Sequence, residues 1–335
     1  MSPLDLSNSP TLAASRGFSL TTLTALQALA VRLGTECSAS SSLSTLVVAG
    51  SLGRLEAHTQ SDCDAIIVVA PLGHPPWPVE AFFAQVGAYG LRAPKQAGIY
   101  RSTLSAAALL RAQDRGSLEE TPDIFGRRMA CLLDTRAVTG EAAFGALRRS
   151  VLEWYAGDYL GHYADAQWTL LINDLSRYLH AYAGWQQYKF GATEDDGWYL
   201  RQAKLRSSRL LTFAGLLLLL GASSTHGCEK LEWLAAHLAL TPLERIAMVM
   251  QPLDPAGFER FLSAYEAVHA QLSDPQTRAR LIALSPPAGG GLPRVFPEPY
   301  ASIHATSGCL LRELTRFVLA RGAAWHPDFF SYLLF

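Results

Sequence analysis

Two short apolar runs rich in valine and isoleucine dominate the pattern of hydrophobic and polar positions along this chain. They cover residues 43–49 (LSTLVVA) and 65–70 (AIIVVA), and a glycine-containing turn and a polar stretch separate them. Continuous apolar runs of this length, bounded by turn residues, are typical of buried strands. The pattern therefore predicts two neighbouring strands in a hydrophobic core.

Segments with helical spacing of apolar residues surround these two runs. Residues 19–36 and 79–89 are expected to be helices, the first with Ser or Thr near its start as a cap. Residues 97–100 (AGIY) favour a third, short strand. From residue 141 onward nearly every segment has a helical pattern, which predicts that the second half of the chain is helical.

Residues 164–184 are predicted to form an amphipathic helix in that second half. At 100° per residue, its apolar side chains fall in one arc, whereas Asn173, Arg177 and His180 fall together on the opposite face. This polar cluster is expected either to reach a functional cleft or to form the solvated side of the helix.

Residues 201–221 are apolar almost all round, which indicates a buried helix. A stripe of polar or small residues nevertheless runs along it: Arg201, Lys204, Ser208, Thr212 and Gly215. Such a stripe should face something polar, unless only the first turns emerge into solvent. The leucine-rich run 210–220 is too short to span a bilayer, so no membrane span is expected.

The composition is that of a globular protein. The chain has 335 residues, of which 49% are hydrophobic and 17% charged, and its formal net charge is −1. This charge argues against broad binding to duplex nucleic acid, which requires a surplus of Lys and Arg. The five cysteines are scattered without a CxxC pair, and the start of the chain lacks the pattern of a signal peptide, so a cytoplasmic protein is expected.

The segment between the two predicted strands carries the candidate chemistry. Gly50 and Gly53 let backbone amides approach a ligand closely, and Asp62 and Asp64 open the second strand. Residues two apart in a strand share a face, so the two carboxylates repel each other unless a cation or a shared proton intervenes. A divalent metal beside a phosphate-binding turn satisfies this requirement. The alternative is a hairpin with a capped turn and two solvated aspartates.

The order of an apolar strand, Gly50-Ser51, a variable spacer and Asp62-Cys63-Asp64 resembles the signature of the DNA polymerase β-like nucleotidyltransferase superfamily. Gly53-Arg54, Glu56 and Ser61, together with the run from Leu132 to Gly140, are similar to the bacterial uridylyltransferase-like branch and its stand-alone relatives. The resemblance implies an α+β fold: a catalytic core with a short mixed β-sheet and flanking helices in residues 1–150, followed by an all-helical domain in residues 151–335.

The resemblance also implies roles for individual residues. Asp62 and Asp64 would be the catalytic residues and would hold Mg²⁺ or Mn²⁺. The residues that would bind an NTP or dNTP are Gly50, Ser51, Gly53, Arg54, Arg201, Lys204 and Ser208, with Arg54 either on phosphate or paired with Glu56. The family usually has a third metal-binding carboxylate on a later strand. Here the next loop supplies it through Asp114, Glu119, Glu120 or Asp123, or two carboxylates suffice.

The sequence leaves three classes of function open, which differ in the acceptor of the nucleotide. The stand-alone relatives include antiphage-defence enzymes that make nucleotide signals or short template-free oligomers, which is the favoured expectation. Transfer of uridylyl or adenylyl groups to a protein comes second, and a non-catalytic nucleotide-binding scaffold is a third. Asn173 and Arg177 match a run in these relatives. The aromatic C-terminus is expected to dock onto the helical domain or an oligomer partner, or to present Tyr332 or Ser331 as an acceptor.

Overall fold

The computed structural model describes residues 4–36, 42–59, 61–70, 76–94, 99–188, 197–287, 293 and 295–334. These residues form two compact units. The sheet unit comprises the described residues of 14–171 and 226–241, and the helical unit those of 1–13, 172–225 and 242–335. The predicted division near residue 150 falls inside a helix of the sheet unit, Glu141–Ala156.

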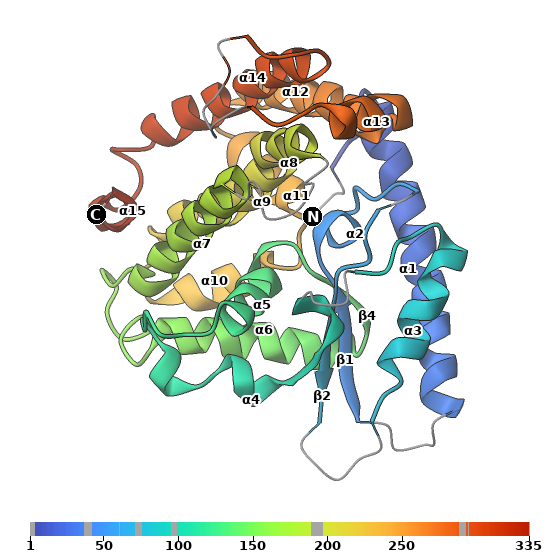
Figure 1. The fold of residues 1–335 in the computed structure, drawn as a ribbon. Helices are drawn as coiled ribbons and strands as arrows, with labels where there is room; N and C mark the ends of the chain where they lie inside the picture. The colour runs from blue at the N-terminus through green and yellow to red at the C-terminus, as the bar shows by residue number, and fades with distance from the viewer. Residues whose placement is uncertain are drawn as a thin grey trace. The chain divides into compact units, whose positions relative to one another are not determined.

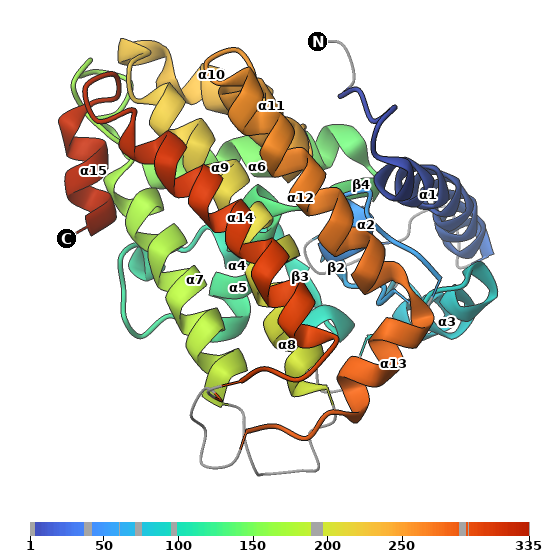
Figure 2. The ribbon, with the colours of Figure 1, turned by 90° about the horizontal axis from the view of Figure 1, so that it is seen from above.

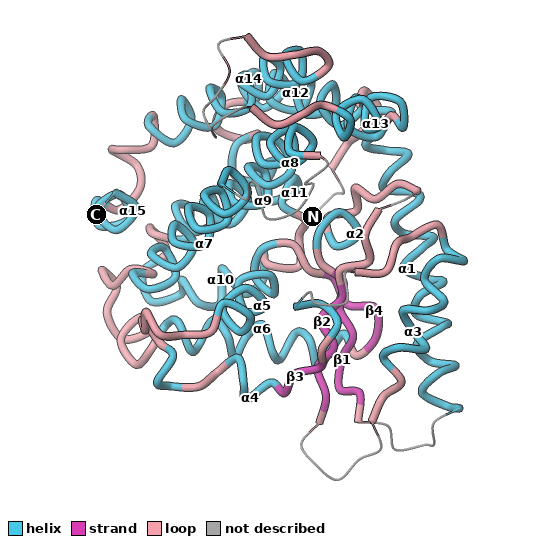
Figure 3. The backbone as a smooth tube through the Cα atoms, viewed as in Figure 1, coloured by secondary structure: helices cyan, strands magenta, loops and turns pink. Residues whose placement is uncertain are grey.

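The sheet unit contains a mixed sheet of four strands in the order β3-β2-β1-β4, which Figure 3 shows side by side. β1 is antiparallel to both β2 and β4, whereas β2 and β3 are parallel. The strands are β1 (Leu43–Val48), β2 (Ala65–Val69), β3 (Thr103–Ser105) and β4 (Arg136–Thr139). The two apolar runs thus form the central strands, as the sequence predicts.

Helices cover both faces of this sheet. One face packs through Leu46, Val48 and Ile67 against apolar side chains of α1 and α3. α5 and α6 lie on the other side in Figure 1, and α6 contacts β1. The helices and helical turns of the unit are α1 (Pro10–Glu36), α2 (Gly50–Gly53), α3 (Val79–Gln85), η1 (Val86–Tyr89), η2 (Ile99–Arg101), α4 (Ala106–Leu109), η3 (Ala112–Asp114), α5 (Pro122–Leu133), α6 (Glu141–Ala156), η5 (Gly227–Glu229) and α10 (Lys230–His237).

The predicted helix at 19–36 is confirmed as part of the longer α1. The one at 79–89 is confirmed as α-helix for α3, after which residues 86–89 form the 3₁₀ turn η1. The prediction of a strand at 97–100 is wrong for its two described residues. Ile99 and Tyr100 belong to a 3₁₀ turn, and the strand β3 begins only at Thr103. The sequence pattern could not separate the two, since β3 has only three residues and buries only Leu104. Residues 97 and 98 lie outside the described part of the chain.

The helical unit contains no strand among its described residues. Its elements are α7 (Thr169–Tyr188, from residue 172), α8 (Trp198–Lys204), the π-helical turn η4 (Leu205–Arg209), α9 (Leu210–Ser223), α11 (Pro242–Met250), α12 (Pro255–Ser273), α13 (Pro275–Ala283), α14 (Tyr300–Leu319) and α15 (Pro327–Leu334). α12 and α14 lie side by side in Figure 2, and Arg260 of α12 donates to both carboxylate oxygens of Glu313 in α14. The predominance of helix in the second half of the chain is confirmed.

α8, η4 and α9 form one helix, Trp198–Ser223, which is long and apolar enough to cross a membrane by length and composition. Within the protein, 61% of its most apolar window is buried. Leu216, Leu218 and Leu219 have no exposed surface, which is the burial expected of a core helix. The described residues therefore contain no clear membrane span.

Candidate functional site

The turn after β1 lies directly beside the start of β2. The backbone N–H of Ala49 donates to the carbonyl oxygen of Asp64 over 2.8 Å, which holds the two chain segments together. Gly50 follows with φ +68°, a conformation that favours glycine. A Cβ atom on Gly50 would lie 3.3 Å from Oδ2 of Asp64. The carboxylate of Asp64 therefore lies against the Gly50-Ser51 turn, so the structure brings these predicted site residues together.

Alternation along the chain separates the two aspartates from the residue between them. Cys63 is fully buried, whereas 47% of the Asp62 side chain is exposed and Asp64 is half-buried. Burial, and then the charges of Asp64 and Asp62, raise the pKa of the Cys63 thiol. The expected arrangement, with Cys63 turned into the core and both carboxylates turned away from it, is thus present.

A cation that the sequence reasoning missed lies beside this acidic pair. Nη2 of Arg92 is 3.0 Å from Oδ1 of Asp62, and both side chains are about half exposed, at 50% and 47%. The backbone fixes this placement, because Arg92 accepts a hydrogen bond from Cys63 N–H and donates one to the carbonyl of Ser61. A signal was visible in the sequence, where Arg92 opens a stretch up to Leu110 without any Asp or Glu.

Gly53 and Arg54 stabilise the turn from its buried side. A Cβ atom on Gly53 would lie 2.7 Å from the carbonyl oxygen of Val48 and would overlap that of Asp134. Arg54 donates to Glu56 over 2.7 Å and to Asp134 over 2.6 Å, with only 4–5% of each side chain exposed. Of the two roles left open for Arg54, pairing with Glu56 is the one observed. The two residues act here as packing and ion-pairing elements of the turn.

Three of the four candidates for a third carboxylate are engaged in ion pairs with neighbouring arginines. Asp114 accepts from Arg111 over 3.0 Å, Asp123 accepts from Arg127, and Glu120 accepts from Arg128. The fourth, Glu119, is exposed. Among the residues that the structure describes, no group of three or more His, Cys, Asp or Glu side chains is placed to hold a metal ion. A third carboxylate from this loop and a site with two carboxylates both stay predictions.

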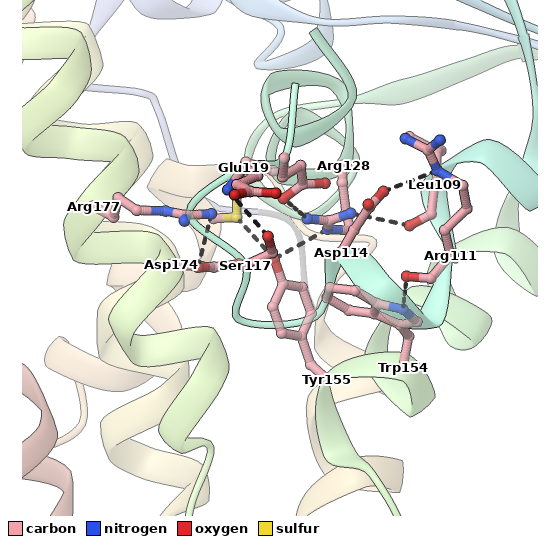
Figure 4. Close-up of polar contacts among 12 residues, drawn as sticks. Leu109, Arg111, Asp114, Ser117, Glu119, Arg128, Trp154, Tyr155, Asp174 and Arg177 are labelled. Atoms are coloured by element: carbon pink, nitrogen blue, oxygen red, sulfur yellow. Dashed lines mark hydrogen bonds and ion pairs between the residues drawn. The ribbon is translucent and has the colours of Figure 1, made fainter. Parts of the chain in front are cut away.

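Arg128 is the centre of a buried cluster beneath this loop, which Figure 4 shows. Its guanidinium lies 4.1 Å from the ring centre of Trp154, and it donates to the Tyr155 hydroxyl over 3.3 Å and to the Leu109 carbonyl over 3.2 Å. The indole of Trp154 donates to the carbonyl of Arg111. Together with the ion pair between Arg128 and Glu120, these contacts hold the loop against α5 and α6. Glu120 therefore has a structural role as the partner of Arg128.

The candidate phosphate-binding residues of the second half belong to the helical unit. Arg201 and Lys204 are half-buried on α8, and the hydroxyl of Ser208 donates to the Lys204 carbonyl over 3.4 Å. Thr212 likewise bonds its own helix, at the carbonyl of Ser208. The two hydroxyls of the predicted stripe are thus used within the helix, whereas a role of the two cations with a triphosphate stays a prediction.

The remaining candidates also lie in the helical unit. Asn173 is exposed, and Arg177 pairs with Asp174 over 3.2 Å, as Figure 4 shows. This local pair is present whether the polar face of α7 serves a cleft or only solvent, so both interpretations stand.

The C-terminal segment docks onto the helical unit, which confirms one of the expected alternatives. Trp325 is buried against Gly221 of α9, where an added Cβ would lie 2.7 Å from Cη2 of the indole. The N–H of His326 donates to the hydroxyl of Ser224. Tyr332 is 38% exposed on α15, and its service as an acceptor stays a prediction.

Comparisons of the chain with protein-family models, with curated proteins and with solved structures find no match. The resemblance to nucleotidyltransferases therefore rests on the sequence of this chain alone.

Proposed function

We propose that this chain is a metal-dependent, template-independent nucleotidyltransferase. It would transfer a nucleoside monophosphate from an NTP or dNTP to a hydroxyl acceptor and release pyrophosphate. One observation carries the proposal: the carboxylate of Asp64 lies against the Gly50-Ser51 turn, and Asp62, two residues earlier, is exposed. A carboxylate beside a glycine turn places a cation-binding group next to a phosphate-binding group.

The donor set suits Mg²⁺ or Mn²⁺. Both prefer hard oxygen ligands, and Mg²⁺ is commonly held by one or two carboxylates while phosphate and water fill its other positions. Asp62 and Asp64 would supply those carboxylates, since both are turned out of the core. When bound, the metal would neutralise charge on the triphosphate and lower the pKa of the attacking hydroxyl.

The residues of the chain would do the positioning. The backbone amides of Gly50 and Ser51 and the Ser51 hydroxyl would lie along the terminal phosphates. Arg54, through Glu56 and Asp134, would keep the turn in place from the buried side. In the transfer, the acceptor hydroxyl gives up its proton to solvent, its oxygen forms a bond to the α-phosphorus, and the bond from that phosphorus to the bridging oxygen of the departing pyrophosphate breaks. Such reactions depend mainly on positioning and charge neutralisation.

The proposal is tested with α-labelled NTPs and dNTPs, each incubated with the protein and Mg²⁺ or Mn²⁺ and resolved on denaturing gels. Asp62→Asn and Asp64→Asn should each lower turnover by on the order of 100-fold or more, while leaving the unfolding transition in place. Asp158→Asn is the matched control, because Asp158 is an exposed acid of the same unit. A ladder of products would identify polymerisation, and label on protein would identify protein modification. Wild-type turnover by the Asp62→Asn, Asp64→Asn double variant would refute the proposal.

A further inference from the structure

Three aromatic side chains form a continuous row on one face of α7. Tyr178, Tyr182 and Trp185 are four and then three residues apart, which places them on neighbouring turns of the same face. The rings of Tyr178 and Tyr182 are nearly parallel at 19°, with centres 6.1 Å apart, and Trp185 follows at 6.1 Å from Tyr182. We call these three residues the aromatic row.

The aromatic row emerges from the core rather than filling it. Leu171 and Leu175, earlier along the helix, have no exposed surface. By contrast, Trp185 is 55% exposed and the two tyrosines are partly exposed. Burying an aromatic side chain is strongly favourable, so a row of rings left at the surface indicates a surface that serves in binding.

A basic segment lies beside the aromatic row. Between Trp198 and Cys228 the chain has no Asp or Glu but four cationic residues, Arg201, Lys204, Arg206 and Arg209. The guanidinium of Arg209 lies 5.2 Å from the ring centre of Tyr182, which ties this segment to the row directly. Arg206 and Arg209 are part of the π-helical turn η4, an irregularity that often occurs at functional sites.

We propose that the aromatic row and Arg209 bind single-stranded nucleic acid, and that this strand is the acceptor whose end is extended. The role of this strand as acceptor rests on the proposed function. An exposed aromatic ring, here that of Trp185, can stack on any base, and a neighbouring cation neutralises the phosphate backbone. The net charge of −1 for the chain does not oppose such binding, because this segment carries positive charge without any acid. A duplex should bind the row only weakly, because its bases are already stacked on one another.

Binding is measured by fluorescence anisotropy with a labelled 12-nucleotide single strand, as DNA and as RNA, and with the corresponding duplex. The full chain carries Asp62→Asn so that no turnover occurs. The single strand should bind at least 10-fold more tightly than the duplex at equal salt. Trp185→Ala should weaken single-strand binding about 5- to 150-fold, the range expected when one stacked base is lost. Trp185→Phe should recover most of that loss.

Tyr163→Ala is the matched control, because Tyr163 is a 66% exposed aromatic residue outside the row. Arg209→Gln should lower the dependence of affinity on salt concentration, as expected when one phosphate contact is lost. Equal affinity of the Trp185→Ala and Tyr163→Ala proteins, or no single-strand binding at low salt, would overturn the proposal. The proposal would also be overturned if the row bound a protein partner but no single strand.

Failure of the two proposals can be told apart. A wild-type protein that binds the strand but transfers no nucleotide would refute the catalytic function and leave the binding surface standing. If, in the presence of the strand, the wild-type and Trp185→Ala proteins transfer nucleotides at the same rate, the row is refuted as an acceptor site while the catalytic function stands.

Discussion

The buried pairing of Arg54 leads to a prediction that separates a structural role from a nucleotide-binding role. Arg54 donates to Glu56 and Asp134, and 4–5% of each of the three side chains is exposed. The substitution Arg54→Met keeps much of the side-chain volume but removes the cation. Two buried carboxylates then lose this partner, and neither can reach water without rearranging the turn.

The size of the effect follows from burial. Removing one partner of a buried ion pair costs about 3–5 kcal/mol, because an uncompensated charge stays inside the protein. The pair between Arg92 and Asp62 is about half exposed on both sides, and an exposed pair of this kind contributes at most about 1 kcal/mol. We therefore expect Arg54→Met to lower the free energy of unfolding several times more than Arg92→Gln does.

The measurement is equilibrium unfolding in urea, followed by tryptophan fluorescence, with nucleotide binding measured on the same samples. A total stability of about 5–15 kcal/mol is typical, so the Arg54→Met protein should fold with a clearly lowered midpoint. If it does not fold, the double variant Arg54→Met, Glu56→Gln removes one of the two stranded charges and should recover part of the loss. A loss below about 1 kcal/mol together with abolished nucleotide binding would refute the structural role.

Two further predictions follow from packing and burial. Gly221→Ala should lower the free energy of unfolding by about 1–3 kcal/mol, because the new methyl group would overlap the Trp325 indole. Gly145→Ala should raise it by about 0.5–1 kcal/mol, because an added Cβ there has no heavy atom within 4 Å. Thermal unfolding of both variants tests this pair, and equal shifts would contradict it. Cys228 is exposed and should react with a thiol reagent at pH 8, whereas Cys63, whose pKa burial raises, should react only after unfolding; rapid modification of Cys63 in the native protein would contradict the geometry.

The sequence was sufficient where short-range patterns determine structure. The two central strands were predictable, because a continuous apolar run between turn residues has few other stable conformations. The burial of Cys63 between two more exposed aspartates followed from the two-residue period of extended chain, although β2 begins only at Ala65, after both aspartates. The helical second half followed from its 3.6-residue period.

These local patterns do not predict contacts between segments that lie far apart in the sequence. Asp134 pairs with Arg54 across eighty positions of sequence, and the pair depends on the antiparallel placement of β4 beside β1. Arg92 reaches Asp62 only because the chain returns alongside Ser61. The position of β3 was mistaken for the same reason: a three-residue edge strand is defined by its parallel pairing with β2 rather than by its own pattern.

The pair between Arg92 and Asp62 bears on how an acidic site can be stable in the absence of a divalent cation. Carboxylates two residues apart repel each other when they lie close together, and Nη2 of Arg92 offsets the charge of Asp62 at 3.0 Å. Because both partners are about half exposed, separating them costs little. Arg92 can therefore leave Oδ1 of Asp62 when a stronger cation competes, whereas buried Arg54 cannot leave Glu56 and Asp134. The connection between β1 and β2 thus contains a buried ion pair at Arg54 and an exposed one at Asp62.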